Sequence, residues 1–439
     1  MTPPAASARP TRVRWLVLAL ICLMSFVAYV LRSNMSVAGV SMIRDLGLSD
    51  LQLGAILAAF AWGYAIFQLP GGVFGEVFGA RKSMTWLALS WGILTFATGL
   101  VPGRAAGPAA VSLGLLVLLR FGMGVAQAPF YPVTSGVSIA RWFPAGAWGL
   151  ANSLGSTALT LGAAAAGPGV AWLVGAAGWR NSFLLAAPLG ALTAGLWWSL
   201  YRESPAEDAR VNEAERDRIA SGAAPPEAAP PAGVWKAVAR DRDVLAITAS
   251  YFCVNYVFYL FFNWFYYYLV DVRGLSPQVG GYFTGAQWMV GAVSAPLGGW
   301  LGDRLTRRLG PRRGYRITIV GGMLLCAPLL VAGALAKNAT VAVTLLSLSF
   351  GATQLVDGPY WAAGMRIGGA HGAVTTGLMN TGGNVVGGVG ALLVPLVARG
   401  FGWPVAISTG ALFALAAAVL WIWIRADRTF GHAAAEVIS

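Results

Sequence analysis

The sequence has little charge. Only 11% of its 439 residues are Asp, Glu, Lys or Arg, and 57% are apolar, whereas an ordinary soluble domain is about 25% charged. A soluble protein of this length would need more charge to cover its surface, and a disordered chain would hold far fewer apolar residues. The composition therefore excludes both classes and predicts a polytopic membrane protein.

Histidine and cysteine are also scarce. There are two histidines, His371 and His432, and three cysteines, Cys22, Cys253 and Cys326. Each cysteine falls in an apolar stretch, which indicates a buried thiol rather than a disulfide partner or a metal ligand. With so few candidates we expect no metal, no cofactor, no catalytic residues and no enzyme activity.

Long apolar runs are abundant. A helix that crosses the hydrocarbon needs about 20 mostly apolar residues, and the runs are continuous rather than alternating, which excludes a strand barrel. The sequence therefore predicts an all-α polytopic membrane protein. We expect twelve transmembrane helices, at about 15–40, 51–75, 83–101, 111–138, 147–174, 182–201, 244–270, 277–302, 316–336, 341–366, 374–398 and 403–424.

One polar segment, 202–243, separates six runs from six. We expect a six-helix bundle at 1–201, a cytoplasmic linker at 202–243, a second bundle at 244–424 and a tail at 425–439. Residues 211–219 within the linker can form a short surface helix. The Ala/Pro run that follows is typical of a linker between domains.

The basic residues predict the orientation. Of the 30 Lys and Arg residues, 22 lie on the side of the two termini, six on the other side, and Arg32 and Arg120 inside runs. Basic residues concentrate in cytoplasmic loops, so we expect both termini in the cytoplasm. The net charge of +13 is then an orientation signal, and no nucleic-acid partner is expected.

The two halves share a loop motif. Residues 71–76 read GGVFGE and residues 298–303 read GGWLGD, and basic residues follow each. The acid can cap a helix or pair with a loop arginine, so these loops can latch one face of the protein, although both could be ordinary helix ends. The gating candidates are Glu76, Arg81, Asp303 and Arg304.

This repeated motif resembles the signature loop of the major facilitator superfamily. The resemblance implies two pseudo-symmetric six-helix halves with a substrate site between them. The sequence departs from the pattern at Val77, where the family usually has a basic residue, so the first latch is expected to be weaker.

Arg32 and Arg120 are charges inside predicted helices, where a charge is costly and usually faces a cavity. They lie about 12 and 13 Å from the predicted outer helix ends. Two guanidinium groups at one depth predict a clamp for an anion. Alternatively, each arginine pairs with a buried acid or extends its charge to the membrane surface.

Asp357 is the third intramembrane charge, about 24 Å from the outer end of its helix. Three interpretations stay open. It can take up and release a proton, act as a counter-ion for the arginines, or cap the kink expected at Gly358-Pro359. The aromatic residues of 251–268 are mostly expected to face lipid or the interface, with Asn255 and Asn263 candidates for the cavity.

Several segments are similar to the anion:cation symporter family, which includes bacterial sugar-acid transporters, sialin and the vesicular glutamate transporters. In that resemblance Arg32 and Arg120 match the substrate-anion and gating arginines. Tyr29, Tyr64 and Asn380 match positions that touch sugar-acid hydroxyls. Further binding candidates are Asn384 and the span-10 aromatic, Trp361 or Tyr360. The resemblance lies in 29–38, 60–64, 68–72, 120–129, 141–144, 178–183 and 380–384.

The departures from that family concern coupling. Leu31 and Gln127 replace acids of its proton-coupled members, Leu57 replaces a histidine and Gly155 a glutamine. An anion that enters a cell alone against 100 mV opposes about 2.3 kcal/mol per charge, so uptake needs a coupled ion or an exchange partner. Asp357 is the intramembrane acid left to carry a proton.

The sequence thus predicts a monomeric secondary transporter of a small organic anion in the bacterial inner membrane. It would work by alternating access, with H⁺ as the coupling ion. Efflux or exchange of zwitterionic or drug-like metabolites is the main alternative, and residues 162–169 (GAAAAGPG) partly resemble an antiporter motif. An integral-membrane enzyme and a transporter-like sensor are the rivals from other classes.

Overall fold

The computed structural model describes residues 9–104, 107–144, 147–220 and 234–430, and within them the chain is helical with no strand. The long helices of the N-terminal part are α1 Val13–Leu46, α2 Asp50–Phe78, α3 Ala80–Gly99, α4 Ala109–Gln127, α7 Trp148–Ala186 and α8 Pro188–Leu200. Those of the C-terminal part are α11 Arg242–Tyr267, α12 Pro277–Leu309, α13 Pro311–Leu335, α14 Ala339–Gly368, α15 Gly372–Phe401 and α16 Trp403–Leu420.

Short elements connect these helices. The chain continues from α4 through α5 Phe130–Pro132, the π-helix η1 Val133–Ile139 and α6 Ala140–Trp142, and from α11 into the π-helix η4 Tyr268–Val272. The others are η3 Pro205–Glu207, α9 Glu213–Ala220, α10 Val234–Val238 and η5 Gly369–His371.

Nine helical stretches of the described residues are long and apolar enough to cross a membrane. One of them, Leu150–Leu200, is 51 residues long and breaks at Gly178, where φ is 82°, so it can cross twice. The helices α3 and α12 are not among the nine. Counting them and the break would give the twelve crossings that the sequence predicts, and that number stays a prediction.

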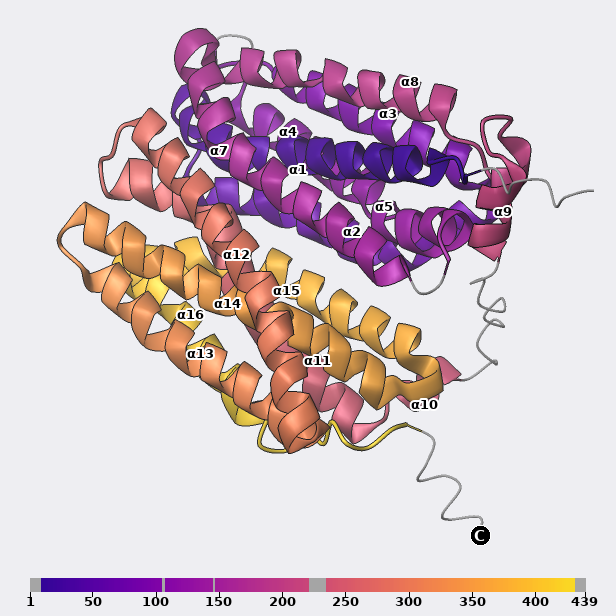
Figure 1. Cartoon of the computed structure of the whole chain (residues 1–439). Coiled ribbons are helices and arrows are strands. Elements are labelled where there is room, and N and C mark those ends of the chain that lie inside the picture. The colour runs from indigo at the N-terminus through magenta and orange to yellow at the C-terminus, as the bar shows by residue number, and fades with distance from the viewer. Residues whose placement is uncertain (1–8, 105–106, 145–146, 221–233, 431–439) are drawn as a thin grey trace, which may run out of the picture.

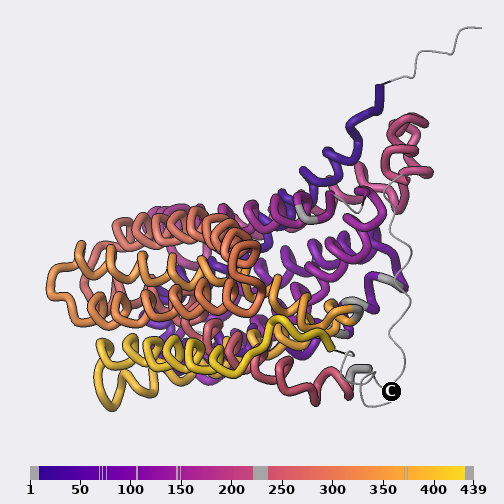
Figure 2. Tube along the Cα trace, turned by 60° about the horizontal axis from the view of Figure 1, so that its bottom comes forward, coloured from indigo at the N-terminus to yellow at the C-terminus, as the bar shows by residue number. Residues whose placement is uncertain are grey.

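The helices form two groups (Figure 1). The N-terminal helices α1 to α8 lie together, the C-terminal helices α11 to α16 lie beside them, and α7 and α12 pack along each other where the groups meet. The tube in Figure 2 shows the same two groups from another side, with the start of α1 beside the linker helix. The space between the groups is where a site for a ligand is expected.

Close packing of α2 on α4 sets the position of Arg120. A Cβ on Gly124 would lie 2.2 Å from the backbone oxygen of Phe60, which no side chain can tolerate, so the two backbones touch because glycine stands there. Arg120 is one helical turn before this contact, and its guanidinium carbon lies 4.9 Å from the centre of the Phe60 ring.

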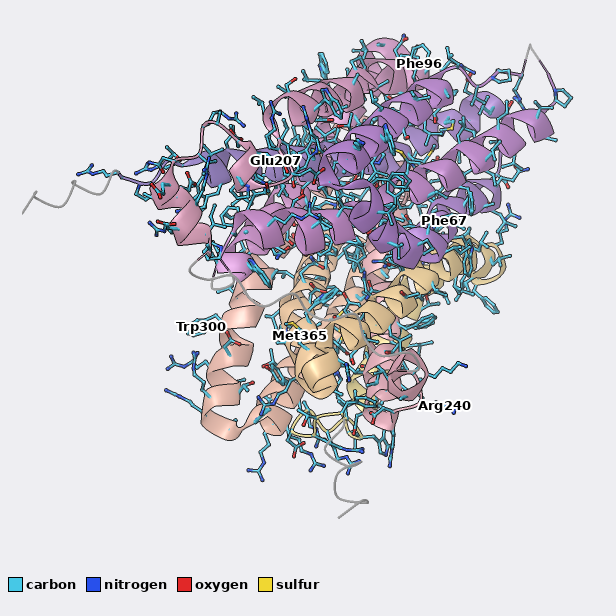
Figure 3. The ribbon with its side chains drawn as sticks, turned by 90° about the vertical axis from the view of Figure 1, so that its right-hand side faces the viewer. Phe67, Phe96, Glu207, Arg240, Trp300 and Met365 are labelled. Atoms are coloured by element: carbon cyan, nitrogen blue, oxygen red, sulfur yellow. The ribbon has the colours of Figure 1, made fainter. Side chains whose placement is uncertain are left out.

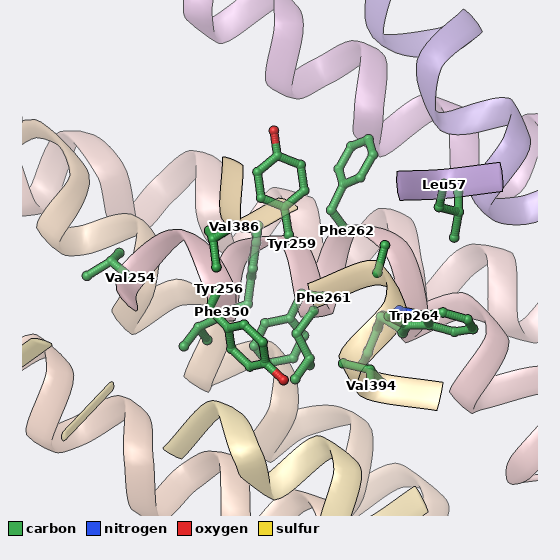
Figure 4. Packing of buried hydrophobic residues seen from close by; sticks show 14 of the residues in the cluster. Leu57, Val254, Tyr256, Tyr259, Phe261, Phe262, Trp264, Phe350, Val386 and Val394 are labelled. Atoms are coloured by element: carbon green, nitrogen blue, oxygen red, sulfur yellow. The ribbon is translucent and has the colours of Figure 1, made fainter. Parts of the chain in front are cut away.

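The aromatic residues of α11 correct one expectation. We expected most of them to face lipid or the interface, yet Tyr256 and Trp264 are fully buried, and Tyr259 is 4% exposed. The reason is the position of α11, which packs against α1, α14, α15 and α16 and so has little surface left for lipid. Figure 4 shows this aromatic packing.

The linker helix α9 confirms the short helix expected near 211–219. Its Glu215 is fully buried and accepts hydrogen bonds from the hydroxyl of Thr11 and the backbone N–H of Val13 and Arg14. The carboxylate thus satisfies the free N–H groups at the start of α1. The Ala/Pro run predicted as a spacer lies outside the described residues.

Candidate functional site

A cavity of about 270 Å³ lies between the two groups of helices. Its volume suits a small organic molecule. Of the two asparagine candidates for the cavity, Asn255 lines it and Asn263 does not. The wall also includes the residues that the sequence analysis named for substrate binding or coupling, except Arg120 and Tyr360. These are Tyr29, Arg32, Tyr64, Asp357, Trp361, Asn380 and Asn384. Tyr360 is not in the wall; it is buried, with its hydroxyl 2.6 Å from that of Ser250.

Arg32 is the cation in the cavity wall. It is 4% exposed, and its Nη2 donates to the Tyr259 hydroxyl at 3.0 Å. Its guanidinium carbon lies over the rings of Phe60 and Phe262, at 4.5 and 4.9 Å from their centres. Its Nε has no hydrogen-bond partner. No acid of the described residues pairs with Arg32, so its buried charge is held by neutral groups alone.

Arg120 lies behind Arg32 rather than opposite it. Its Nη2 donates to the backbone oxygen of Arg32 at 3.4 Å, it is 4% exposed, and its Nε is also without a partner. The helices are longer than expected: from the helix ends at Leu46 and Ala109, Arg32 and Arg120 lie about 21 and 17 Å deep. The equal depths measured from the predicted helix ends are therefore wrong, and the clamp itself stays a prediction.

Asp357 lies in the wall formed by the C-terminal helices. The Tyr251 hydroxyl donates to its Oδ1 at 2.9 Å. Among the described residues no arginine forms an ion pair with it in this conformation, so the counter-ion interpretation has no contact behind it here. Gly358, which follows it, lies against Gly299 of α12.

Tyr259, Tyr251 and Gln68 form contacts of the site that sequence reasoning did not assign. The Tyr259 hydroxyl donates to Oδ1 of Asn384 at 2.7 Å, and Nδ2 of Asn384 lies 3.3 Å from Oε1 of Gln68. A signal was present, because positions 251, 255 and 259 share one helix face, and Tyr251, Asn255 and Tyr259 all line the cavity.

The three predicted gating residues whose side chains the structure describes, Arg81, Asp303 and Arg304, show no hydrogen bond or ion pair between the halves. Arg81 donates twice to the backbone oxygen of Trp198, at 3.0 and 2.7 Å, within the N-terminal group. Arg304 lies over the ring of Trp300, and Asp303 is exposed and forms no ion pair within the described ranges. The side chain of Glu76 lies outside what the structure describes. The view in Figure 3 faces the end that carries Trp300, Met365 and Arg240.

Ion pairs join the halves at the other end of the helices. Arg44 pairs with Asp271 of η4, and Arg399 of α15 pairs with Asp50 of α2, with Nη2 2.7 Å from Oδ1. The partners are 227 and 349 positions apart in the chain, so no local pattern could reveal them. They hold the two groups together at the end where α1 stops and α2 begins.

Glu203 is the acid that serves the first signature loop. Its carboxylate accepts from the backbone N–H groups of Ala80 and Arg81, at 3.1 and 2.8 Å, and from Nη1 of Arg141 at 2.9 Å. It therefore caps the start of α3. The sequence analysis expected an acid to cap a helix at this loop, and it did not name Glu203, which follows α8 in the chain.

Residues 21–391 match the model of the Major Facilitator Superfamily. The chain is 33% identical to the probable sulfoacetate transporter SauU of Cupriavidus necator, over 86% of this chain and 85% of that one. It is 32% identical to the probable galactarate/D-glucarate transporter GudP of Escherichia coli, over 71% and 70%. It is 31% identical to the hexuronate transporter of Bacillus subtilis, over 79% and 78%.

A solved structure has the same fold. It is a bacterial homologue of the human lysosomal transporter Spinster, in an inward-facing and occupied conformation, with a TM-score of 0.78 at 18% identity over 96% of this chain and 98% of that one. The family model, the relatives and the fold all indicate the same class of protein. The relatives and the solved structure are named as transporters, not as enzymes. The chain belongs to the Major Facilitator Superfamily and is a multi-pass membrane transporter.

Proposed function

We propose that the protein is a secondary active transporter of a sugar acid or a similar carboxylate or sulfonate. It would be a monomer in the bacterial inner membrane, with both termini in the cytoplasm. The bundles 1–201 and 244–424 would rock around the cavity by alternating access. The relatives named for sulfoacetate, galactarate/D-glucarate and hexuronate support a small organic acid as cargo.

The observation that carries the proposal is the pair of buried arginines, neither of which has an acid partner among the described residues. Arg32 and Arg120 lie within 5 Å of the same Phe60 ring, at 4.5 and 4.9 Å. Two like charges in a low-dielectric site are costly unless an anion joins them. The guanidinium fork of Arg32 in the cavity wall matches a carboxylate or sulfonate, and Tyr29, Tyr64, Asn380, Asn384 and Trp361 would bind the rest of the cargo.

Asp357 would couple transport to protons. It is a carboxylate on the wall opposite Arg32, with a tyrosine hydroxyl rather than a cation beside it. A proton that binds Asp357 neutralises its charge, so cargo and proton together place less charge in the membrane than either alone. The acids that the family resemblance leads us to expect at two positions are replaced by Leu31 and Gln127. Asp357 is therefore our candidate for the proton carrier.

The conformation would be the inward-facing one. The ion pairs of Arg44 and Arg399 close the end that the basic-residue rule assigns to the outside. The signature loops lie at the other end, where Glu76, Arg81, Asp303 and Arg304 would form the inner gate after the halves rock together.

A counterflow assay in liposomes tests the function. Vesicles preloaded with an unlabelled aldarate, hexuronate, aldonate or sulfoacetate should accumulate the labelled form of the same acid when they contain the purified protein. The variant Arg32→Ala should remove this uptake, whereas Arg312→Ala, at an exposed arginine in the first turn of α13, should keep it. Binding without flux would identify a sensor, and uptake of lipophilic cations instead would identify a drug carrier.

A zwitterionic cargo is the second candidate, because the walls carry opposite charges. An ammonium group on the cargo would bind Asp357 while its acid group binds Arg32. Amino sulfonates and amino acids should then exchange in the same assay, and acids that lack the ammonium should not.

A further inference from the structure

The hydroxyl of Tyr259 occupies a place on Arg32 where an anionic oxygen of the cargo would bind. Nη2 of Arg32 donates to it at 3.0 Å, and both residues line the cavity at 4% exposure. Figure 4 shows the Tyr259 ring above the aromatic cluster, with its hydroxyl pointing away from Tyr256 and Phe350. The hydroxyl thus lies at the boundary between the halves, where it contacts the arginine of the N-terminal half.

The hydrogen bonds give this hydroxyl a fixed direction. Nδ2 of Asn384 donates to the backbone oxygen of Asn380 at 2.8 Å, so the amide oxygen of Asn384 is left to accept the proton of Tyr259, at 2.7 Å. With its proton committed, the phenol oxygen offers only lone pairs to Arg32. An oxygen that only accepts is what a carboxylate or sulfonate presents.

The chain of contacts runs through both halves. It starts at Arg32 on α1, passes Tyr259 on α11 and Asn384 on α15, and returns to Gln68 on α2, whose Oε1 is 3.3 Å from Nδ2 of Asn384. Gly387 makes room for it, because a Cβ there would lie 2.8 Å from the Tyr259 ring. These contacts thus link Arg32 to the place where α2 meets α15.

We propose that Tyr259 is a positioning residue that stands in for the anionic oxygen of the cargo when the site is empty. The inference rests on the proposed function. A carboxylate or sulfonate binds a guanidinium more strongly than a neutral oxygen does, so it displaces the phenol, whereas a neutral polyol gains little by doing so. Displacement frees Tyr259 and with it the link through Asn384 to Gln68. Tyr259 thus both favours charged cargo and reports that the site is filled.

The variant Tyr259→Phe tests the proposal in the full-length protein, because it keeps the ring and removes the competing oxygen. The transported acid should bind about ten- to a hundredfold more tightly, the value of one hydrogen bond to a charged group, and a neutral polyol analogue should be discriminated less well. Phenylglyoxal should modify Arg32 several-fold faster in the empty protein, as measured by mass spectrometry, with no change at Arg120. Gly387→Ala, which displaces the ring, should also speed Arg32 modification.

Tyr256→Phe is the matched control. Its hydroxyl lies on the same helix but 2.7 Å from Thr409, inside the C-terminal half, so neither binding nor Arg32 modification should change. Weaker binding in Tyr259→Phe would overturn the proposal and make Tyr259 a direct cargo contact; an unchanged affinity together with unchanged Arg32 modification would also overturn it. The modification of Arg32 can be measured without cargo. If Tyr259→Phe speeds this modification but the protein binds no organic acid, the hydrogen bond between Tyr259 and Arg32 is supported and the proposed function is rejected.

Discussion

The two walls of the central cavity, one from each group of helices, carry opposite charges. The N-terminal wall holds Arg32, with Arg120 behind it, and neither has an acid beside it within the described part of the chain. The C-terminal wall holds Asp357, with Tyr251 beside it and no base among the described residues. The two groups of helices thus present different chemistry to the cavity. The difference supports recognition of the anion by the first half and coupling by the second, and it can be tested one wall at a time.

Removing Arg32 should have the largest effect. Arg32→Ala takes away the cation of the cavity wall, which makes charge-assisted hydrogen bonds worth about 1.5–3 kcal/mol each, so affinity should fall by about 100-fold or more. Binding by titration calorimetry and counterflow rates measure this. Arg32→Lys keeps the charge without the fork and should lie in between. Normal counterflow in Arg32→Ala would mean that the anion binds elsewhere.

Asp357→Asn should remove proton coupling and leave binding of the anion at Arg32 intact. We expect accumulation driven by an inward proton gradient to fall at least tenfold while counterflow, which needs no net proton movement, continues. Tyr251→Phe removes the hydrogen bond at 2.9 Å and should shift the pH dependence with a smaller loss of rate. Proton-driven accumulation that survives in Asp357→Asn would place the coupling site outside this wall.

Arg120→Ala should cost less than Arg32→Ala, because Arg120 acts on the cavity through its field from behind. A unit charge about 10 Å away at an effective dielectric of about 20 is worth on the order of 1–2 kcal/mol, or about five- to thirtyfold in affinity. Arg120→Lys should recover most of it, since the charge stays. If Arg120→Ala and Arg32→Ala proved equally severe, Arg120 would have to reach the cargo in another conformation.

The ion pairs that hold the walls together should give the smallest effect. Asp50→Asn removes the partner of Arg399 at the closed end, and a partly exposed pair is worth about 0.2–1 kcal/mol. The open and closed populations should therefore shift by up to about fivefold, measured by spin-label distances between the halves. Asp45→Asn breaks the pair with Arg180 inside one half and should leave the populations unchanged.

Much of the site was accessible to sequence reasoning because membrane charges are rare. Arg32 and Asp357 stood out as intramembrane charges, and both line the cavity. Tyr259 did not stand out among the many aromatic residues of its helix. The spacing of 251, 255 and 259 places these residues on one helix face, but it does not tell whether that face meets lipid, core or cavity. Its role came from contacts with Arg32 and Asn384, which are 227 and 125 positions away.

The sequence by itself determined the helical membrane fold, the repeat and the buried charges, because hydrocarbon length and the cost of a charge in lipid act on each segment separately. Only the tertiary structure decided that Arg120 lies behind Arg32, that Glu203 caps α3, and which acids hold Arg44 and Arg399. Those choices depend on which helix faces meet, and helix rotation and contact are properties of the packed halves together.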